Sequence, residues 1–330
     1  KATSGSTRCF SRKMLVIGVD GGATKTEATV MDGEGQIVGK ATSGSTNKNS
    51  VGKDQATMSL VAAVQDSLKA GNADMKDVQC IVLGMSGCDT PSDVDFWLSI
   101  CASKFPSCKA IVENDSVIAL CSGTGGRMEG IVVISGTGSI GLGISQGGSQ
   151  RVRVGGMGPL LGDSGNGYSM GAAALRAAVR ASDGRGPTTE LLGMILDKYK
   201  VPSADGLLEI AYGKGTDVPA KFASWDEVAS LAPLVVKAKR EHGCSVASQI
   251  LEQTAQDICE LAETVAARLS CSSSDSETFT MVLAGGILAD EGSEISSAVH
   301  QRLAASLPRA KVTRPNMTPS EAAARMALTQ

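Results

Sequence analysis

Two glycine-rich turns, each directly after an apolar run, constrain the fold of this chain most. The first turn is D-G-G-A-T-K-T at 20–26, after the run 14–19, and the second is S-G-T-G-S at 135–139, after the run 130–134. Glycines let the backbone approach a ligand closely, and the successive N–H groups of such a turn form a nest that binds anions. One turn alone would mean little, because hairpins use the same residues. Two of them, more than a hundred residues apart, suggest two half-sites that close on one polyphosphate.

Composition argues against several classes of protein. A length of 330 residues favours two domains, and a content of 42% hydrophobic and 20% charged residues is typical of globular proteins. A net charge of −3 with scattered basic residues argues against nucleic-acid binding. No apolar run approaches the roughly 18 residues that a membrane-spanning helix needs. Nine cysteines without C-x-x-C spacing predict reduced, buried thiols in a cytoplasmic protein.

The apolar pattern runs twice through a similar series of strands and helices. In the first half it predicts strands at 14–20, 25–31, 36–41, 78–84 and 110–113. It also predicts a helix over 51–70, a second helix with its cap at Ser92 or Asp93, and a third helix that begins at about Ser116. In the second half it predicts strands at 130–135, 139–145, 150–154 and 280–284, with a mostly helical region up to about 270. This layout predicts an α/β fold with two related domains.

The expected boundaries follow from this repetition. We expect a first domain over 14–122, a second over 123–317, and a terminal helix within 318–330 that packs back on the first domain. Residues 1–13 are basic and rich in Ser and Thr, and their first seven residues, K-A-T-S-G-S-T, are repeated at 40–46. We expect them to form a disordered tail.

Two aspartates directly follow apolar strands. Asp20 could face Mg²⁺ through water or simply form a turn, and the glycine pair behind it with Thr24 ahead favours the first interpretation. Asp115 could act as a general base toward an alcohol, or cap the following helix, and the spacing leaves both interpretations open. Lys25 could neutralise a phosphate or be an exposed strand residue.

Several polar or glycine-rich segments are further candidates. The segment 155–167 is too rich in glycine for a core element, and we expect it to wrap a ligand, with Asp163 bonded to a polar substrate. Asn47, Asn49 and the segment 86–89 could hold substrate or form ordinary turns. The pair Gly285-Gly286, after a buried strand, could admit a base and ribose or begin a helix.

Taken in order, these motifs resemble those of one superfamily. The series D-G-G-x-T-K-T, S-G-x-D, E-N-D, I-S-G-T-G-S, G-G-x-G-x-x-x-G-D-x-G and L-A-G-G resembles the sugar kinase/actin/Hsp70 ATPases over about 14–328. It resembles the N-acetylglucosamine kinases and the BadF/BadG/BcrA/BcrD-type ATPases more closely. The resemblance implies two ribonuclease H-like (actin-like ATPase) domains with a central cleft. It also implies ATP-dependent phosphorylation of N-acetyl-D-glucosamine, or a close amino sugar, at the 6-hydroxyl, with ATP and Mg²⁺ as cofactors.

The resemblance also implies a role for each motif residue. Asp115 would be the catalytic base and Asp20 would lie near the metal. Members of the family usually have Trp in place of Met157 and Glu in place of Ser164, so this chain departs from the pattern on the sugar side. The implied ligand contacts are Gly21, Gly22, Thr24 and Lys25 in a first phosphate loop, Gly136, Thr137 and Gly138 in a second, Gly285 and Gly286 at adenosine, and Asn47, Ser86, Gly87, Asn114, Gly156 and Asp163 at the sugar.

Two other functions stay open at this point. The chain could be an activator-type ATPase of the BadF/BcrA class, in which cysteines at a dimer interface hold an iron–sulfur cluster. Cys88 and Cys121 are the candidates for that role, although they lack the glycine-flanked pattern of such activators. The chain could instead be a catalytically weak, nucleotide-dependent sugar sensor. A homodimer is compatible with each of these functions.

Overall fold

The computed structural model describes residues 14–213, 221–271, 277–290 and 292–330, so the expected tail at 1–13 lies outside the described residues. Contacts divide the chain into two compact units. Among the described residues, the first unit contains 14–128 and 315–330, and the second contains the rest, between 129 and 314. The first unit is therefore built from two separate stretches of the sequence.

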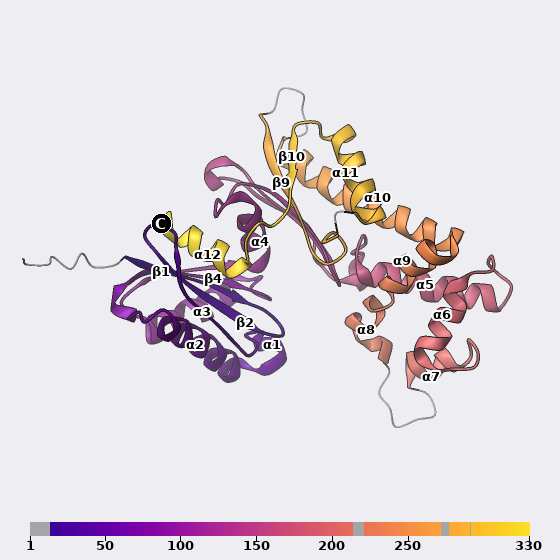
Figure 1. Ribbon diagram of the computed structural model, residues 1–330, viewed down its shortest axis with the longest axis horizontal. Coiled ribbons are helices and arrows are strands. Elements are labelled where there is room, and N and C mark those ends of the chain that lie inside the picture. Colours follow the sequence, from indigo (N-terminus) through magenta and orange to yellow (C-terminus); the bar gives the residue numbers. More distant parts are fainter. Residues whose placement is uncertain (1–13, 214–220, 272–276, 291) are drawn as a thin grey trace, which may run out of the picture. The chain divides into compact units, whose positions relative to one another are not determined.

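The first unit is a five-stranded sheet with helices on both faces (Figure 1). Its elements are β1 (Leu15–Gly21), β2 (Thr26–Asp32), β3 (Ile37–Ser43), α1 (Lys48–Val51), α2 (Lys53–Ala70), β4 (Val78–Met85), α3 (Pro91–Lys104), β5 (Lys109–Asn114), α4 (Asp115–Thr124) and α12 (Pro319–Leu328). The strand order is β3-β2-β1-β4-β5. β1, β2 and β3 form an antiparallel meander, whereas β4 and β5 run parallel to β1.

The two faces of β1 bury different layers of helices. Side chains alternate between the faces of a strand, so Leu15, Ile17 and Val19 share one face. They pack there with residues of α2 and α3 in one hydrophobic core. Gly18 faces the opposite way, where a β-carbon on it would lie 2.1 Å from the backbone N of Ala324 in α12. The absence of a side chain at Gly18 is what lets the terminal helix lie directly on the sheet.

The second unit has the same sheet topology. Its elements are β6 (Gly130–Ser135), β7 (Ser139–Ile144), β8 (Arg151–Gly155), α5 (Gly167–Ser182), α6 (Glu190–Tyr199), α7 (Gly206–Tyr212), α8 (Trp225–Ala229), α9 (Ala232–His242), α10 (Ser245–Arg268), β9 (Phe279–Ala284), α11 (Glu294–Ser306) and β10 (Ala310–Thr313). The order is β10-β9-β6-β7-β8. Again three antiparallel strands are followed by two that run parallel to the first of them, β9 beside β6 and β10 beside β9. A core that includes α5, α6, α9 and α10 packs on this sheet.

Three details differ from the sequence expectations. The helix α3 begins at Pro91 and is capped by Thr90, because Pro suits the first helical position and Asp93 completes a capping box with Thr90. The expected domain boundary at 122 falls inside α4, and the two units divide after residues 128 and 314 instead. The strand β10 was not expected, because it is a four-residue edge strand without a clear apolar alternation.

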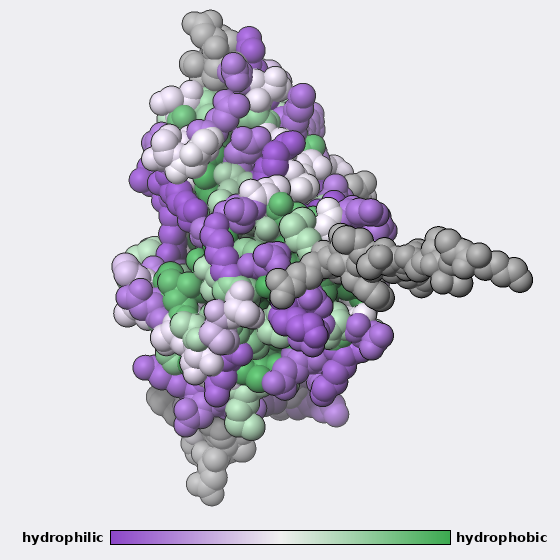
Figure 2. Space-filling model, turned by 90° about the vertical axis from the view of Figure 1, so that its left-hand side faces the viewer, coloured by the Kyte–Doolittle hydropathy of each residue, from purple (hydrophilic) through white to green (hydrophobic). Residues whose placement is uncertain are grey.

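The described helices offer no membrane-spanning segment, since none of them is both long and apolar enough to cross a bilayer. On the face drawn in Figure 2, hydrophobic residues are interrupted by hydrophilic ones.

Candidate functional site

In the first unit, three predicted motifs meet at one edge of the sheet. The strands β1, β4 and β5 are parallel neighbours, so their carboxyl ends lie at the same edge. The backbone N–H of Ser86 donates to the carbonyl of Gly21 at 2.8 Å. A β-carbon on Gly21 would lie 2.5 Å from Thr46 Oγ1 and 2.6 Å from Met85 Sδ. The turn after β1, the loop before α1 and the turn after β4 are therefore in close contact.

The predicted first phosphate loop, residues 21–25, is a tight turn. The N–H of Gly22 donates to the carbonyl of Lys25 at 3.0 Å, and the N–H of Thr46 donates to the carbonyl of Gly22 at 3.3 Å. The side chains of Thr24 and Lys25 are exposed on this turn. Their hydroxyl and ammonium groups are thus available to a ligand at the end of β1.

Asp20 lies near enough to Asp115 at this edge to feel its charge. Burial, and then the charges of Asp115 and Glu27, raise the pKa of Asp20 to about 6. Burial also raises the pKa of Asp115, against the opposing effect of a hydrogen bond from Ser86. Two partly desolvated carboxyl groups repel each other when both are ionised, and a nearby cation would relieve that repulsion.

A magnesium ion fits this pair in its chemistry. Mg²⁺ commonly takes one or two carboxylates and completes its shell with water and substrate phosphates. Within the part of the chain that the structure describes, no group of three or more His, Cys, Asp or Glu side chains could hold a metal. If Mg²⁺ binds here, Asp20 is the carboxylate placed to hold it together with phosphate oxygens and water.

Asn114, the last residue of β5, caps the helix α4. Its Oδ1 accepts from the N–H of Ser116 at 2.9 Å, and its Nδ2 donates to Asp89 Oδ1 at 3.2 Å. The interpretation of Asp115 as the cap is therefore wrong, because the neighbouring amide takes that position. Asp115 is the first residue of the helix, where the positive end of the helix dipole favours a carboxylate.

The loop before α1 brings together further sugar-site candidates. The side-chain atoms nearest to a β-carbon on Gly87 would be Asn49 Nδ2 at 3.6 Å and Asn47 Oδ1 at 3.9 Å. Asn47 also caps α1 by accepting from the N–H of Asn49 at 3.1 Å. An ion pair between Lys48 and Asp93 joins the start of α1 to α3. Lys48 could not be singled out from the sequence, because a single lysine between two asparagines carries no signal of a distant partner.

In the second unit, the second phosphate loop (residues 136–138) is held from one side. The N–H of Gly136 donates to the carbonyl of Gly138 at 2.9 Å. The first two residues of α5 donate to this loop, Gly167 to Gly136 at 2.8 Å and Tyr168 to Thr137 at 3.1 Å. A β-carbon on Gly136 or Gly138 would have no neighbour within 4 Å. The loop is therefore fixed through its carbonyls and open above its glycines.

The predicted adenosine motif lies beside this loop, because β6 and β9 are parallel neighbours with Ile134 opposite Ala284. Gly285 has a φ of +95°, and a β-carbon on it would lie 2.2 Å from the carbonyl oxygen of Ser135. Gly286 has open space around it. Gly285 is therefore required by the packing of two strand ends, whereas Gly286 leaves room for a ligand.

The sugar loop (residues 155–163) is folded back on itself by a carboxylate. Asp163 accepts hydrogen bonds from the N–H groups of Met157 at 3.1 Å and Gly158 at 2.7 Å. Directly after it, the carbonyl of Ser164 accepts from the hydroxyl of Ser139 at 2.6 Å. This segment is thus a fixed loop, and a sugar contact of Asp163 or Gly156 stays a prediction.

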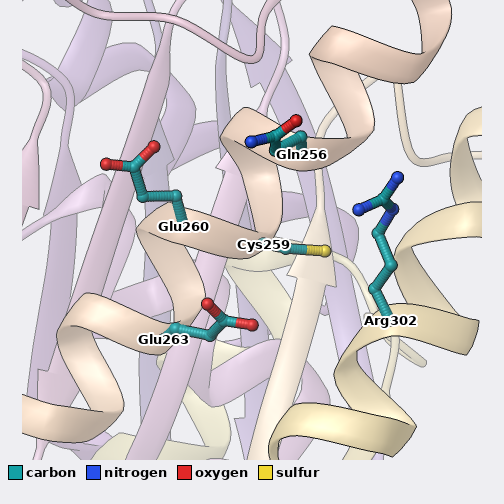
Figure 3. A pocket seen from close by; sticks show the side chains of 5 residues that line it. All are labelled: Gln256, Cys259, Glu260, Glu263 and Arg302. Atoms are coloured by element: carbon teal, nitrogen blue, oxygen red, sulfur yellow. The ribbon is translucent and has the colours of Figure 1, made fainter.

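A separate pocket of about 380 Å³ lies between α10 and α11. Figure 3 shows that Gln256, Cys259, Glu260 and Glu263 reach it from α10 and Arg302 from α11. None of the predicted site residues lines it.

The cysteines considered for an iron–sulfur cluster are buried. Cys121 is 0% exposed and Cys88 is 5% exposed. Burial also raises the pKa of the Cys88 thiol to about 11, which disfavours the thiolate that binds iron. These positions therefore give no support to the activator alternative.

Comparison with known proteins places the chain in a family. Residues 17–323 match the BadF/BadG/BcrA/BcrD ATPase family, and the chain belongs to this family. It is 32% identical over 326 residues to the N-acetyl-D-glucosamine kinase of Dictyostelium discoideum, with 96% of this chain and 98% of that protein covered. It is 33% identical over 273 residues to the N-acetylmuramic acid/N-acetylglucosamine kinase of Clostridium acetobutylicum, with 83% and 85% covered.

A solved structure supports the same fold. A Chromobacterium violaceum protein, assigned provisionally as an N-acetylglucosamine kinase, gives a TM-score of 0.67 at 22% identity, with 97% of this chain and 100% of that chain covered. Together with the two five-stranded mixed sheets, this likeness confirms the predicted α/β class with two actin-like ATPase domains. The resemblance drawn from the ordered motifs is confirmed as well.

Proposed function

We propose that this protein is an ATP-dependent kinase that phosphorylates N-acetyl-D-glucosamine, or a close amino sugar, at its 6-hydroxyl. Two relatives with 96% and 83% of this chain covered are sugar kinases. One arrangement carries the assignment of the chemistry: Asp115 is released from capping by Asn114 and lies within electrostatic reach of Asp20. A carboxylate beside a potential metal ligand suits the transfer of a phosphoryl group to an alcohol.

In this proposal, Asp115 is the general base. It accepts the proton of the 6-hydroxyl as that oxygen attacks the γ-phosphorus, and the bond to the bridging oxygen breaks to release ADP. The hydrogen bond from Ser86 favours the ionised form that a base requires. Mg²⁺ held beside Asp20 would neutralise the developing charge on the phosphates.

The nucleotide would be bound by the glycine-rich turns. We propose that the first phosphate loop, with Lys25, and the second phosphate loop each bind nucleotide phosphate. The open space above Gly136 and Gly138 supports a phosphate at the second loop. The open space at Gly286 supports adenosine beside it.

We propose sugar ligands in each unit. Asn47, Ser86 and Gly87 are supported by their closeness to one another and to Asp115. Asn114 and Asp163 already bond to neighbouring residues, so they would act through the shape of their loops as much as through direct contact. Gly156 completes the proposed set. We further propose a cytoplasmic location, and a homodimer remains compatible with this function.

A coupled assay of ADP release with a panel of sugars tests this function. We expect N-acetylglucosamine to stimulate ADP release in the presence of Mg²⁺, with glucosamine, N-acetylmuramic acid and glucose as comparisons. Phosphorus NMR of the product should place the phosphate on the 6-oxygen. If no sugar raises ADP release above the rate without sugar, the kinase assignment fails.

A further inference from the structure

Two consecutive residues of α8 contact two different candidate ligand loops of the second unit. A β-carbon on Gly158, in the sugar loop, would lie 2.9 Å from Cη2 of the Trp225 indole ring. The hydroxyl of Thr137, in the second phosphate loop, donates to Asp226 Oδ1 at 3.1 Å. The first turn of α8 therefore touches both loops at once.

The helix α8 is held in place by contacts with α5 and α6. A β-carbon on Gly171 of α5 would lie 1.9 Å from the carbonyl of Val228, so the two helices are in direct backbone contact. The Tyr199 hydroxyl donates to Glu227 Oε1 at 2.9 Å, which fixes α8 to α6 as well. Because later residues of α8 anchor the helix, Trp225 and Asp226 are not needed for its attachment.

The side chains of Trp225 and Asp226 are both exposed, so a ligand could reach them. Trp225 is 53% exposed, although an indole ring gains from burial. The sugar-loop residues Met157, Leu160 and Leu161 are exposed as well. Asp226 and Thr137 are exposed beside the open glycines of the second phosphate loop.

The carboxylate of Asp226, bonded to the Thr137 hydroxyl, opposes phosphate binding at the second phosphate loop. The Thr137 hydroxyl has one proton to donate, so it cannot serve Asp226 and a phosphate oxygen in the same bond. The backbone carbonyl of Thr137 is held by Tyr168, so the side chain is the part of the residue that can turn. Phosphate must displace Asp226 from the hydroxyl and then tolerate its negative charge nearby.

We propose that the first turn of α8 positions both ligand loops, with Trp225 supporting the sugar loop and Asp226 competing with nucleotide phosphate for the Thr137 hydroxyl. This inference rests on the proposed kinase function, which supplies the two ligands. Asp226 thereby weakens nucleotide binding and favours release of ADP. Trp225 covers Gly158, whose φ of +94° is a conformation that a loop holds only when its surroundings support it.

Direct binding measurements on single variants test the two roles separately. Asp226→Asn keeps an acceptor for Thr137 but removes the charge, and we expect it to bind a non-hydrolysable ATP analogue about three- to tenfold more tightly by calorimetry. Trp225→Ala should weaken N-acetylglucosamine binding by about tenfold and leave the Kd of the ATP analogue unchanged. Trp225→Phe, which keeps a ring over Gly158, should restore most of the sugar affinity.

Glu209→Gln is the matched control for charge. Glu209 is exposed on α7 of the same unit, and its substitution makes the same change in net charge. It should leave both Kd values at the wild-type level. In steady state, the Asp226 variant should change KM for ATP and not KM for the sugar, a selectivity that a general loss of structure would not produce.

The outcomes separate this inference from the proposed function. Unchanged or weaker nucleotide binding by Asp226→Asn, or an equal loss of both ligands in Trp225→Ala and Trp225→Phe, would overturn the inference even if the wild-type protein is a kinase. If no sugar stimulates ADP release, the proposed function fails, but the nucleotide affinities of Asp226→Asn and Glu209→Gln still decide the role of Asp226.

Discussion

The side chain of Asn114, one residue before Asp115, caps α4 by accepting a hydrogen bond from the N–H of Ser116. Asp115 is therefore not the cap of this helix, and the proposed function assigns it the role of general base. We expect Asp115→Asn to lower kcat by about 10²–10⁴-fold, because it removes the proton acceptor and keeps the shape. Calorimetry should show nucleotide binding like that of wild type, and retained turnover would contradict the assignment of the base.

Asn114→Ala is the complementary variant. It removes the cap of α4, so we expect a loss of about 1 kcal/mol in the free energy of unfolding. Urea unfolding monitored by circular dichroism measures this loss. An unchanged midpoint would mean that Asp115 can take over the cap.

Asp20 should reduce the stability of the folded protein at neutral pH. Its pKa is raised from 3.8 to about 6 on folding, so the folded state holds the proton more tightly. Below pH 3.8 the carboxyl is protonated in both states and carries no charge penalty. As the pH rises to 6, stability is lost, and above 6 the loss is complete.

Asp20→Asn should therefore unfold at a higher temperature than wild type at pH 7.5 without Mg²⁺. We expect a gain on the order of 2 kcal/mol that disappears toward pH 4. Thermal unfolding across this pH range measures it. A difference that does not depend on pH would exclude the charge of Asp20 as the cause.

Two adjacent glycines give a matched pair of variants in the second unit. Gly285→Ala would place a methyl group 2.2 Å from the Ser135 carbonyl in a left-handed backbone conformation, so we expect a loss of about 3 kcal/mol or more. Gly286→Ala meets nothing within 4 Å and should keep its stability. Chemical unfolding compares the two, and equal losses would contradict the packing described here. A raised KM for ATP in Gly286→Ala alone would support adenosine binding there.

Gly18→Ala tests the close contact between β1 and the terminal helix α12. The added methyl group would collide with the backbone of α12 at 2.1 Å, and we expect a loss of about 3 kcal/mol or more. Gly193→Ala in α6, where nothing lies within 4 Å, is the control and should be neutral or stabilising by up to about 1 kcal/mol. Hydrogen exchange should show lost protection of residues 319–328 in the Gly18 variant alone.

Every described strand except β10 was predictable, because apolar runs and the turns that follow them are local signals. The strand expected at 130–135 is β6 (Gly130–Ser135), and the one expected at 78–84 ends one residue later as β4. The site motifs could also be located, since each follows such a strand. Their hydrogen-bond partners could not, because they join residues far apart in the sequence. Lys48 and Asp93 are 45 residues apart, and Thr137 and Asp226 are 89 apart.

The position of α12 on β1 affects the order in which the two units can fold during synthesis. The residues of the second unit are contiguous, so that unit is available to fold once the chain has passed 314. The first unit begins earlier but completes later, because the face of β1 that carries Gly18 stays uncovered until 319–328 have left the ribosome. Domains usually complete in the order in which they are made. Here α12 is synthesised last although it belongs to the first unit. A chain terminated before α12 would therefore leave the Gly18 face of β1 without the helix that packs on it.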